Sequence, residues 1–227
     1  MGLGAWVIVN DNWGVTAAHT AQLVQEMYDA KGESRIPNAT VWLGANQMRL
    51  GQTYYLDQAA DIAVFEIENL PKRWTDRARF RTGPMKPGAS ILRMGFPFHN
   101  LEVAFDNESG EFKFNTGTPA MFPTEGITTR LLILDVKPTP PPYPVHLVET
   151  SSPGIKHQSG GPILDVEETV WAIQTKTRLL DLGISGQVID SSGSEIAIPQ
   201  YLNSGFGADA ETVMGFLDHH GISYQTD

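Results

Sequence analysis

The sequence predicts an all-β protein, either a barrel or a sandwich, from three observations. Its apolar segments are short, rich in Val, Ile, Trp and Phe, and bounded by turn residues, which is typical of strands. Its 22 glycines and 15 prolines are scattered between these segments without a repeat period. Its 227 residues are 41% hydrophobic, enough to bury a substantial core in one or two domains. Many short strands at irregular spacing favour a barrel or sandwich over a helical fold.

Eight segments are expected to be strands because each is apolar and ends at turn residues. In chain order they are Ala5–Val9, Thr40–Leu43, Ile62–Ile67, Ala89–Met94, Leu131–Val136, Val145–Val148, Val170–Ile173 and Glu195–Ile198. A further hairpin is predicted with its tip at Asp106–Glu111, between Val103–Phe105 and Phe112–Phe114.

Two segments are predicted to be helices. Ala17–Ala30 carries apolar residues at helical spacing and ends near Lys31–Gly32, and Asp209–His219 does the same and stops at Gly221. Pro138–Pro144 is expected to be an extended surface connection, because proline has no N–H to donate to a strand ladder.

Composition excludes several classes of function. The formal net charge of −10 argues against a nucleic-acid partner, whose phosphates would be repelled. No apolar run approaches the ~20 residues that span a bilayer, so no membrane insertion is expected. Met1–Trp6 lacks the basic start and apolar stretch of a signal peptide, and the chain has no cysteine, so we expect a cytoplasmic protein without disulfides or thiolate metal sites.

Three short segments set a chemically capable polar residue against an apolar strand. A histidine closes Trp13–His19, a carboxylate opens the strand within Ala60–Phe65, and a serine followed by two glycines stands in Gln158–Ile163. Taken singly, a lone histidine, an aspartate before a strand and a Ser-Gly-Gly-Pro turn each have a structural explanation.

Together the three segments supply the parts of nucleophilic hydrolysis. The Ser159 hydroxyl needs a base to take its proton, and a neutral imidazole such as His19 suits that task near pH 7. A carboxylate such as Asp61 fixes the opposite ring nitrogen as N–H and stabilises the imidazolium. Gly160 and Gly161 leave room for an acyl group, and backbone N–H groups nearby can point at an oxyanion.

These segments resemble the motifs of trypsin- and chymotrypsin-like serine proteases. Ile8–His19 resembles the segment around the catalytic histidine, Asp61–Val64 the aspartate motif, and Ser159–Pro162 the serine motif. The order is that of the family, and the separations of 42 residues (19 to 61) and 98 residues (61 to 159) are close to it. Pro87–Pro97 and Ile196–Pro199 resemble the strand that opens the second barrel and the last strand before the C-terminal helix in the bacterial cytoplasmic and HtrA-like branch.

The resemblance implies two packed antiparallel Greek-key β-barrels with a C-terminal α-helix on the outside. Residues 1–84 would form the first barrel and carry the histidine and the aspartate. Residues 85–227 would form the second barrel, which carries the serine, and the helix. In the cleft between them His19 would act as general base and acid, Asp61 would orient it, and Ser159 would attack the carbonyl. Asp57 is a weaker rival for the orienting carboxylate.

The primary substrate pocket is expected from the same resemblance. One wall would include Pro153 and Gly154, and the other would include Gln174, Thr175 and Lys176. The six residues before Ser159 include no acid, so a preference for Arg or Lys lacks its counter-charge. Lys176 and Arg178 either attract an acidic substrate group or are solvated strand-end charges.

The sequence departs from the family at three points. The family's oxyanion-hole glycine is replaced by His157, which would share the hole with the backbone of Ser159. A residue with a side chain resists a positive φ, so we expect a distorted or substrate-induced hole. Gln158 stands where animal trypsins have the aspartate that pairs with a new N-terminus. The first strand of the first barrel also has no counterpart, which would leave an edge that invites dimerisation.

The prediction is therefore a cytoplasmic serine endopeptidase that cleaves peptides or proteins through an acyl-enzyme, without a cofactor or metal. Adjacent His219 and His220 point apart on a helix and lack partner ligands, so no metal site is assigned to them. Two alternatives stay open: an esterase using the same three residues, and a non-catalytic, peptide-binding relic of the fold.

Overall fold

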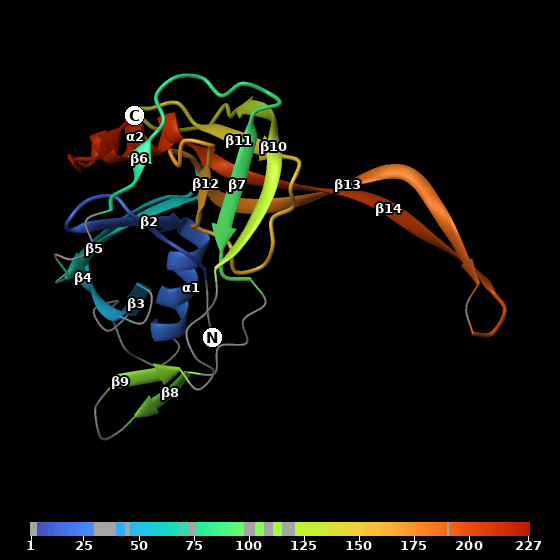
Figure 1. The fold of residues 1–227 in the computed structure, drawn as a ribbon, viewed down its shortest axis with the longest axis horizontal. Coiled ribbons are helices and arrows are strands. Elements are labelled where there is room, and N and C mark those ends of the chain that lie inside the picture. The colour runs from blue at the N-terminus through green and yellow to red at the C-terminus, as the bar shows by residue number, and fades with distance from the viewer. Residues whose placement is uncertain are drawn as a thin grey trace.

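The computed structural model describes residues 4–29, 40–43, 46–68, 70–71, 76–97, 103–106, 111–114, 121–189 and 191–227. Within these residues two large sheets and one separate hairpin account for nearly all regular structure, and two helices accompany them (Figure 1). The all-β prediction is confirmed. Neither described helix has the length and apolar character needed to cross a bilayer.

The first sheet contains five antiparallel strands in the order β1-β2-β5-β4-β3. They are β1 (Val7–Ile8), β2 (Trp13–Ala17), β3 (Thr40–Leu43), β4 (Asn46–Asp57) and β5 (Ile62–Glu68). β2 and β5 are buried along nearly their whole length, because both faces of the sheet are covered there. Ile62 and Val64 belong to the main apolar cluster, whereas Phe65 and Ile67 belong to a second one. β1 and β3 form the edges of this sheet.

The register of β2 and β5 positions the first half of the candidate site. Ala17 at the end of β2 lies opposite Ile62 at the start of β5. The chain turns directly from β2 into helix α1 (Ala18–Asp29), so His19 is the second residue of that helix. Asp61 directly precedes β5. Antiparallel pairing therefore brings these two residues together although they are 42 positions apart.

The second sheet contains eight strands in the order β12-β7-β10-β11-β14-β13-β6-β15. A further pairing of β12 with β13 closes six of them into a ring, so this half is a true barrel with no free edge between them. The strands are β6 (Arg79–Phe80), β7 (Ser90–Gly95), β10 (Phe122–Ile133), β11 (His146–Thr150), β12 (Pro162–Leu164), β13 (Val170–Ile189), β14 (Glu195–Asp209) and β15 (Gln225–Thr226).

Helix α2 (Ala210–His219) packs into the main hydrophobic core, which contains residues from both sheets. Its buried residues Val213, Phe216 and Leu217 have exposed fractions of 0%, 2% and 0%. They belong to the same cluster as Val15 and Ile62 of the first sheet and several apolar residues of the second sheet. Burial of each large apolar side chain contributes about 1.5–3 kcal/mol, so the helix is an integral part of the core that unites the two sheets.

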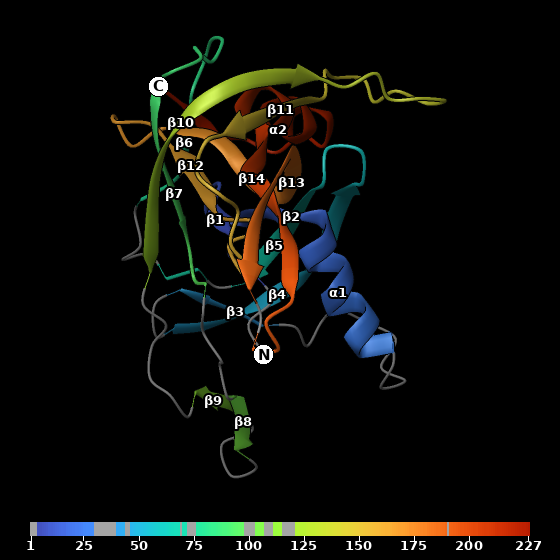
Figure 2. The same cartoon turned by 90° about the vertical axis from the view of Figure 1, so that its right-hand side faces the viewer.

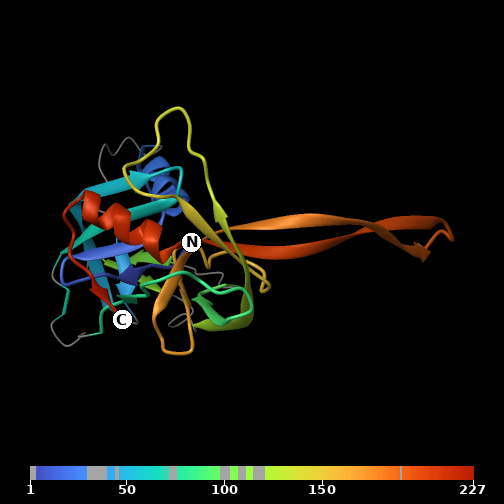
Figure 3. The same cartoon turned by 90° about the horizontal axis from the view of Figure 1, so that it is seen from above.

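Two hairpins leave the body. β8 (Val103–Asp106) and β9 (Glu111–Phe114) pair as predicted and lie apart from both sheets (Figure 2). Of the predicted tip, Asp106 and Glu111 pair with each other as strand residues, and 107–110 lie outside the described residues. β13 and β14 continue far beyond the barrel as a two-stranded arm (Figures 1 and 3).

The arm corrects the interpretation of Ile196–Pro199. These residues were expected to form the last barrel strand before the C-terminal helix, yet they lie in the distal arm. The barrel strand next to the helix is formed by residues 205–209, where Gly207 and Ala208 pair with β11 and β13. The apolar alternation of Ile196–Pro199 correctly indicated a strand but carried no information about its partner.

The helix predictions are confirmed within a residue or two, apart from the predicted end near Lys31–Gly32, which is outside the described residues. The sequence interpretation missed β2, β4, the first half of β10, most of β13 and β14, and the short strands β6 and β15. In β4 and β10 polar residues hide the alternation. The division into domains at residue 84 stays a prediction.

The N-cap of α2 gives the protein a pH-dependent stability. Asp209 accepts a hydrogen bond from Glu211 N at 3.1 Å, and burial raises the pKa of its carboxyl from 3.8 to about 6. The folded state therefore holds this proton more tightly than the unfolded state. Its contribution to stability is full below pH 4 and is lost as pH rises through 6.

We expect Asp209→Asn to remove this dependence while keeping a side-chain cap. Between pH 4 and pH 7.5 the free energy of unfolding of the native protein should fall by roughly 2–3 kcal/mol more than that of the variant. Denaturant titrations at several pH values measure the difference. Parallel pH profiles for the two proteins would contradict the assignment.

Candidate active site

His19 and Asp61 form a tightly joined pair at the end of β2. The ring Nδ1 of His19 lies 3.0 Å from Oδ1 and 2.9 Å from Oδ2 of Asp61, and the backbone N–H of His19 donates to the same Oδ1 at 3.0 Å. The His19 side chain is 42% exposed and that of Asp61 is 25% exposed. The carboxylate thus holds the ring by one nitrogen and leaves Nε2 free of hydrogen bonds within the described residues.

The backbone of Asp61 makes this arrangement possible. Its φ of 56° lies in the left-handed region, which aspartate tolerates better than most residues. Its carbonyl oxygen accepts from Ala18 N at 3.0 Å while its carboxylate accepts from His19 N. Asp61 therefore supplies the N-terminal cap of α1 as well as the partner of the ring.

Asp57 is not the orienting carboxylate in this structure. Its Oδ1 accepts from the backbone N–H of Ala59 and Ala60, and its Oδ2 accepts from the Tyr143 hydroxyl at 2.6 Å. Burial and this carboxylate together raise the pKa of Tyr143. Of the two rivals weighed from the sequence, only Asp61 contacts the histidine.

Ser159 lies in the loop between β11 and β12, and backbone bonds hold this loop on two sides. Ala5 N donates to the Ser159 carbonyl at 2.7 Å, and Gly160 N donates to the Gln174 carbonyl at 2.7 Å. A Cβ built on Gly160 would lie 2.1 Å from Thr16 Oγ1 and 3.0 Å from Ala17 N. The glycine after the serine thus allows the loop to pack against the strand end that leads into His19.

The Ser159 hydroxyl does not contact His19 in this structure. It donates to the Thr175 carbonyl at 3.3 Å, and no hydrogen bond joins the serine to the histidine although both are described. A change of the Ser159 χ1 rotamer is the local movement that redirects Oγ. The fold brings His19 and Asp61 together and places the serine loop against the segment before the histidine.

His157 adopts the positive φ that the sequence interpretation expected it to resist. Its φ is 74°, at the third position of a turn closed by Gln158 N donating to the Ile155 carbonyl at 3.1 Å. A second bond, from Ile155 N to Gln158 Oε1 at 3.1 Å, locks the same turn. A turn with positive φ at this position is usually occupied by glycine. The backbone geometry is therefore kept at a cost in strain.

Gln158 is a structural residue of the serine loop. Its side chain is 1% exposed, and its Nε2 donates to Thr124 Oγ1 at 3.4 Å in addition to the bond with Ile155. Gly95 leaves the space that this side chain fills. The turn before Ser159 is thus fixed by a residue of the loop itself.

The five predicted pocket residues lie in different environments. Pro153 and Gly154 are half-buried, Lys176 is exposed, and Thr175 is buried with its carbonyl bonded to Ser159. Gln174 is only 1% exposed, and its amide donates to the Met94 carbonyl at 2.6 Å and the Pro162 carbonyl at 3.1 Å. The side chain of Gln174 is therefore committed to the wall behind the pocket.

Sequence reasoning missed Arg93, which lies behind the same wall. Arg93 is 1% exposed and donates from Nε to Gln174 Oε1 at 3.1 Å. The available signal was strand alternation, because Arg93 shares the inward face of β7 with Ile91 and Gly95. An arginine at an inward position of an apolar strand indicates a buried polar site.

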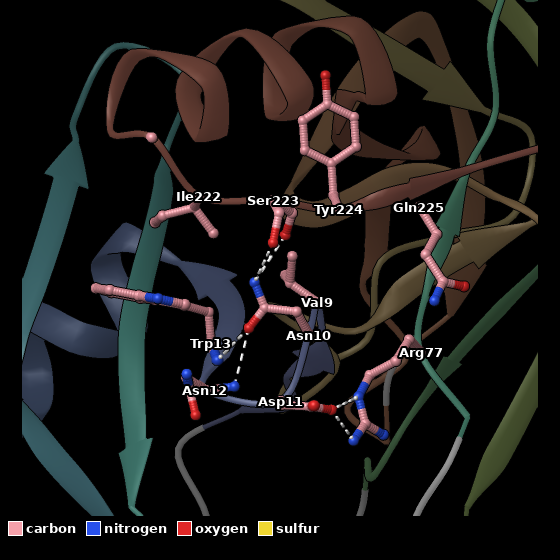
Figure 4. Close-up of a pocket in the computed structure, with 11 residues that line it drawn as sticks. Val9, Asn10, Asp11, Asn12, Trp13, Arg77, Ile222, Ser223, Tyr224 and Gln225 are labelled. Carbon is pink, nitrogen blue, oxygen red and sulfur yellow. Dashed lines mark hydrogen bonds and ion pairs between the residues drawn. The ribbon is translucent and has the colours of Figure 1, made fainter.

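A cavity of about 410 Å³ lies elsewhere, between the β1–β2 turn and the C-terminal segment (Figure 4). Its lining includes Asn10, whose amide donates to the Ser223 carbonyl at 2.7 Å, and Asp11, which pairs with Arg77 at 2.6 Å. None of the predicted site residues lines it. Its polar groups join the turn to the C-terminal segment, which is a structural role.

One group of three potential metal ligands occurs among the described residues, at the N-terminus of α2. Ligand atoms of His146, Asp209 and Glu211 lie within 4.8 Å of one another. Asp209 already caps the helix, and His146 Nδ1 lies 3.3 Å from Glu211 Oε2. A helix cap and an ion pair account for this cluster without an ion.

No protein-family model matches the sequence, and no curated protein matches it. Solved structures do match. The active form of the Rv3671c protease from M. tuberculosis has a TM-score of 0.57 and 19% identity, over 99% of this chain and 76% of its own. The MamO protease domain from Magnetospirillum magneticum has a TM-score of 0.53 and 13% identity, over 95% of this chain and 88% of its own.

The HtrA-type protease AlgW, solved with a decapeptide, has a TM-score of 0.54 and 18% identity over 97% of this chain and 53% of its own. At these identities the similarity establishes the fold and no more. The predicted chymotrypsin-like architecture is confirmed, and so is the resemblance to HtrA-type and trypsin-like proteases at the level of fold.

The strained turn before Ser159 predicts the effect of one substitution. His157→Gly removes the side chain from a left-handed position, and we expect a gain in stability of up to about 1 kcal/mol. Lys156→Gly, at the neighbouring position of the same turn, is the matched control. It should destabilise the protein because its φ is not positive and glycine only loosens the unfolded chain. The midpoints of urea unfolding of the two variants measure these changes in stability. A loss of stability in His157→Gly would contradict backbone strain at this position.

Proposed function

We propose that this chain is a serine endopeptidase of the trypsin-like kind, acting on peptides or proteins through an acyl-enzyme. Ser159 is the nucleophile, His19 the general base and acid, and Asp61 the residue that holds the ring. The observation that carries the proposal is the contact of His19 Nδ1 with both Asp61 carboxylate oxygens at 3.0 and 2.9 Å. This contact makes Nε2 the basic nitrogen. The packing of Gly160 against Thr16 and Ala17, just before His19, supports the serine as its partner.

In the proposed reaction Ser159 Oγ leaves the Thr175 carbonyl, attacks the substrate carbonyl carbon, and passes its proton to His19 Nε2. The tetrahedral oxyanion is stabilised by the backbone N–H groups of His157 and Ser159. The His19 proton then goes to the departing amine, which leaves an ester on Ser159. Water, deprotonated by His19, attacks this ester; His19 then returns the proton to Ser159 Oγ as the bond to the acyl group breaks and the acid product leaves.

The backbone around Ser159 supports the proposed oxyanion hole. The Ser159 N–H makes no hydrogen bond within the described residues, so it is available to an oxyanion. The positive φ of His157 is the conformation that a glycine would adopt there. The expectation of a distorted hole was the main reason to consider an esterase, and the positive φ of His157 supports an undistorted hole instead.

The sequence supports a cytoplasmic location and a protein partner for this activity. The chain has no cysteine and therefore no disulfide, which fits a reducing compartment. Its net charge of −10 disfavours nucleic acid as the substrate. Peptide or protein chains, bound in extended form in the cleft between the barrels, are the substrates we propose.

We expect a fluorophosphonate probe to label Ser159, because only an activated serine reacts. Ser159→Ala should abolish labelling, whereas Ser185→Ala on the exposed arm should leave it unchanged. Asp61→Asn should slow peptide hydrolysis by roughly 10³–10⁴-fold, because the amide would favour the wrong tautomer of the ring. Intact-mass spectrometry and a fluorogenic peptide assay measure these effects.

Unlabelled protein with a native circular-dichroism spectrum would contradict the proposal and favour the non-catalytic, peptide-binding alternative. The bond from Ser159 Oγ to the Thr175 carbonyl is the observation on the side of that alternative. Matched ester and amide substrates separate the remaining possibility. Hydrolysis of the ester alone would indicate an esterase.

A further inference from the structure

Arg93 is a buried positive charge that the proposed mechanism does not use. Its side chain is 1% exposed, and its hydrogen-bond acceptors are neutral: Gln174 Oε1 for Nε at 3.1 Å and Thr150 Oγ1 for Nη1 at 2.8 Å. Among the described residues no carboxylate lies within ion-pair distance of it. Burial alone lowers its pKa to about 10. Removing a guanidinium from water without a counter-ion costs several kcal/mol, and the two neutral acceptors do not balance its charge.

The guanidinium lies against the predicted substrate pocket. A Cβ built on Gly205 would be 2.0 Å from Nη1 and 2.5 Å from Cζ, and one built on Gly154 would be 3.3 Å from Nη2. Gly154 belongs to one predicted wall of the pocket, and Gly205 pairs with Thr177, just beyond the other wall. Two glycines therefore leave the space that the charged end of Arg93 occupies between the walls.

We propose that the primary pocket selects an acidic side chain, Glu or Asp, on the residue before the scissile bond, and that Arg93 is the specificity-determining residue. This rests on the proposed function. Nη2 of Arg93 donates no hydrogen bond within the described residues, so it is available to a substrate carboxylate. Lys176 and Arg178, both exposed on β13, add positive potential at the entrance in a chain of net charge −10.

The entrance is narrow in this structure. A Cβ on Gly154 would lie 1.9 Å from Thr177 Oγ1, so these two residues touch across the pocket. Thr177 is exposed, and a rotation of its short side chain separates the two walls without moving the strand. A carboxylate that enters there gains a charge-assisted hydrogen bond that an amide of the same shape cannot match.

The test uses two peptides that differ only in a C-terminal Glu-amide or Gln-amide, titrated into the Ser159→Ala variant. We expect the Glu peptide to bind at least about tenfold more tightly. Arg93→Met should abolish the preference, and Arg93→Lys should keep part of it. Because binding to Ser159→Ala needs no catalysis, the result is independent of whether the protein is a peptidase.

Equal affinity for the two peptides would overturn the inference, whether or not fluorophosphonate labels Ser159. Tighter binding of the Gln peptide would overturn it as well. If Arg93→Met fails to fold, the comparison of the two peptides on Ser159→Ala still decides. Failure of labelling together with a clear preference for Glu would leave Arg93 as the recognition residue of a non-catalytic peptide-binding protein.

An independent observation concerns the β13–β14 arm, which stands clear of the body (Figures 1 and 3). Its pairing sets Leu180 opposite Leu202 and Val188 opposite Ile196, and Ile198 lies on the same face of β14 as these partners. Four of these five side chains are 47–49% exposed, and Leu180 is half-buried. A two-stranded hairpin with one side exposed is marginally stable in water.

The two faces of the arm differ in chemistry. The face just described, which we call the apolar arm face, consists of Leu180, Gly186, Val188, Ile196, Ile198 and Leu202. Gln200 is the polar residue in its middle, and Arg178 lies on the same side at its base. The opposite face mixes apolar side chains with polar ones, among them Asp181, Ser185, Gln187 and Asn203. Leu182 and Ile184, 49% and 56% exposed, lie in the irregular stretch between the two halves of the arm.

We propose that the apolar arm face packs against the same face of a second copy of this chain. From Leu180 and Leu202 to Val188 and Ile196 the described residues of this face carry no charge, so the contact itself brings no like charges together. A contact of one face with itself is satisfied by a twofold axis. The buried area is on the order of 500 Å² per chain and 1,000 Å² in total, which reaches the lower limit of a specific interface. Two stacked ribbons would then enclose a small apolar layer.

Sedimentation of the full chain at concentrations up to about 100 μM tests this. We expect a dimer, and we expect Ile198→Glu to raise its dissociation constant at least about tenfold. Gln187→Glu, on the opposite face, is the matched control and should leave the dimer intact. A monomeric native protein at the highest concentration would overturn the proposal. Equal weakening by both variants would do so too, because the contact would then not depend on the face.

Discussion

The contact between the Asp61 carboxylate and the start of α1 is the constraint on which the candidate site depends. The Asp61 carboxylate accepts hydrogen bonds from the backbone N–H and the ring Nδ1 of His19. The backbone carbonyl of Asp61 accepts a hydrogen bond from the N–H of Ala18. Helix start, ring orientation and strand register are thus fixed by the same residue. Because β2 and β5 are central strands of their sheet, a slip of one position would send Asp61 to the other face.

The serine loop is held by a different principle. Its backbone is bonded on one side to Ala5 and on the other to Gln174, and β12 follows within three residues as a strand paired on both sides. Glycine after the serine allows the close approach to β2. The hydroxyl is then the one part of this site that a single bond rotation can redirect, since backbone and histidine are both held by several bonds.

The contact of His19 with Asp61 could be predicted from the sequence, whereas the surroundings of the candidate site could not. His19, Asp61 and Ser159 stand out because polar residues next to apolar strands are few and their types match a known reaction. The left-handed turn at His157, the burial of Gln174 and the position of Arg93 depend on contacts between residues far apart in the chain. The arm was missed for a related reason: Ile196–Pro199 alternates like a barrel strand, and alternation does not reveal whether a strand is covered.

The backbone at His157 also determines how this position can vary. A φ of 74° is accessible to glycine and, at modest cost, to asparagine and aspartate. Valine, isoleucine and threonine would clash with their own backbone there. Among homologous chains with the same turn, substitutions at this position should therefore be restricted to the few residue types that tolerate a positive φ, whatever their hydrophobicity or charge. The backbone φ angle thus limits which residues are tolerated two positions before Ser159.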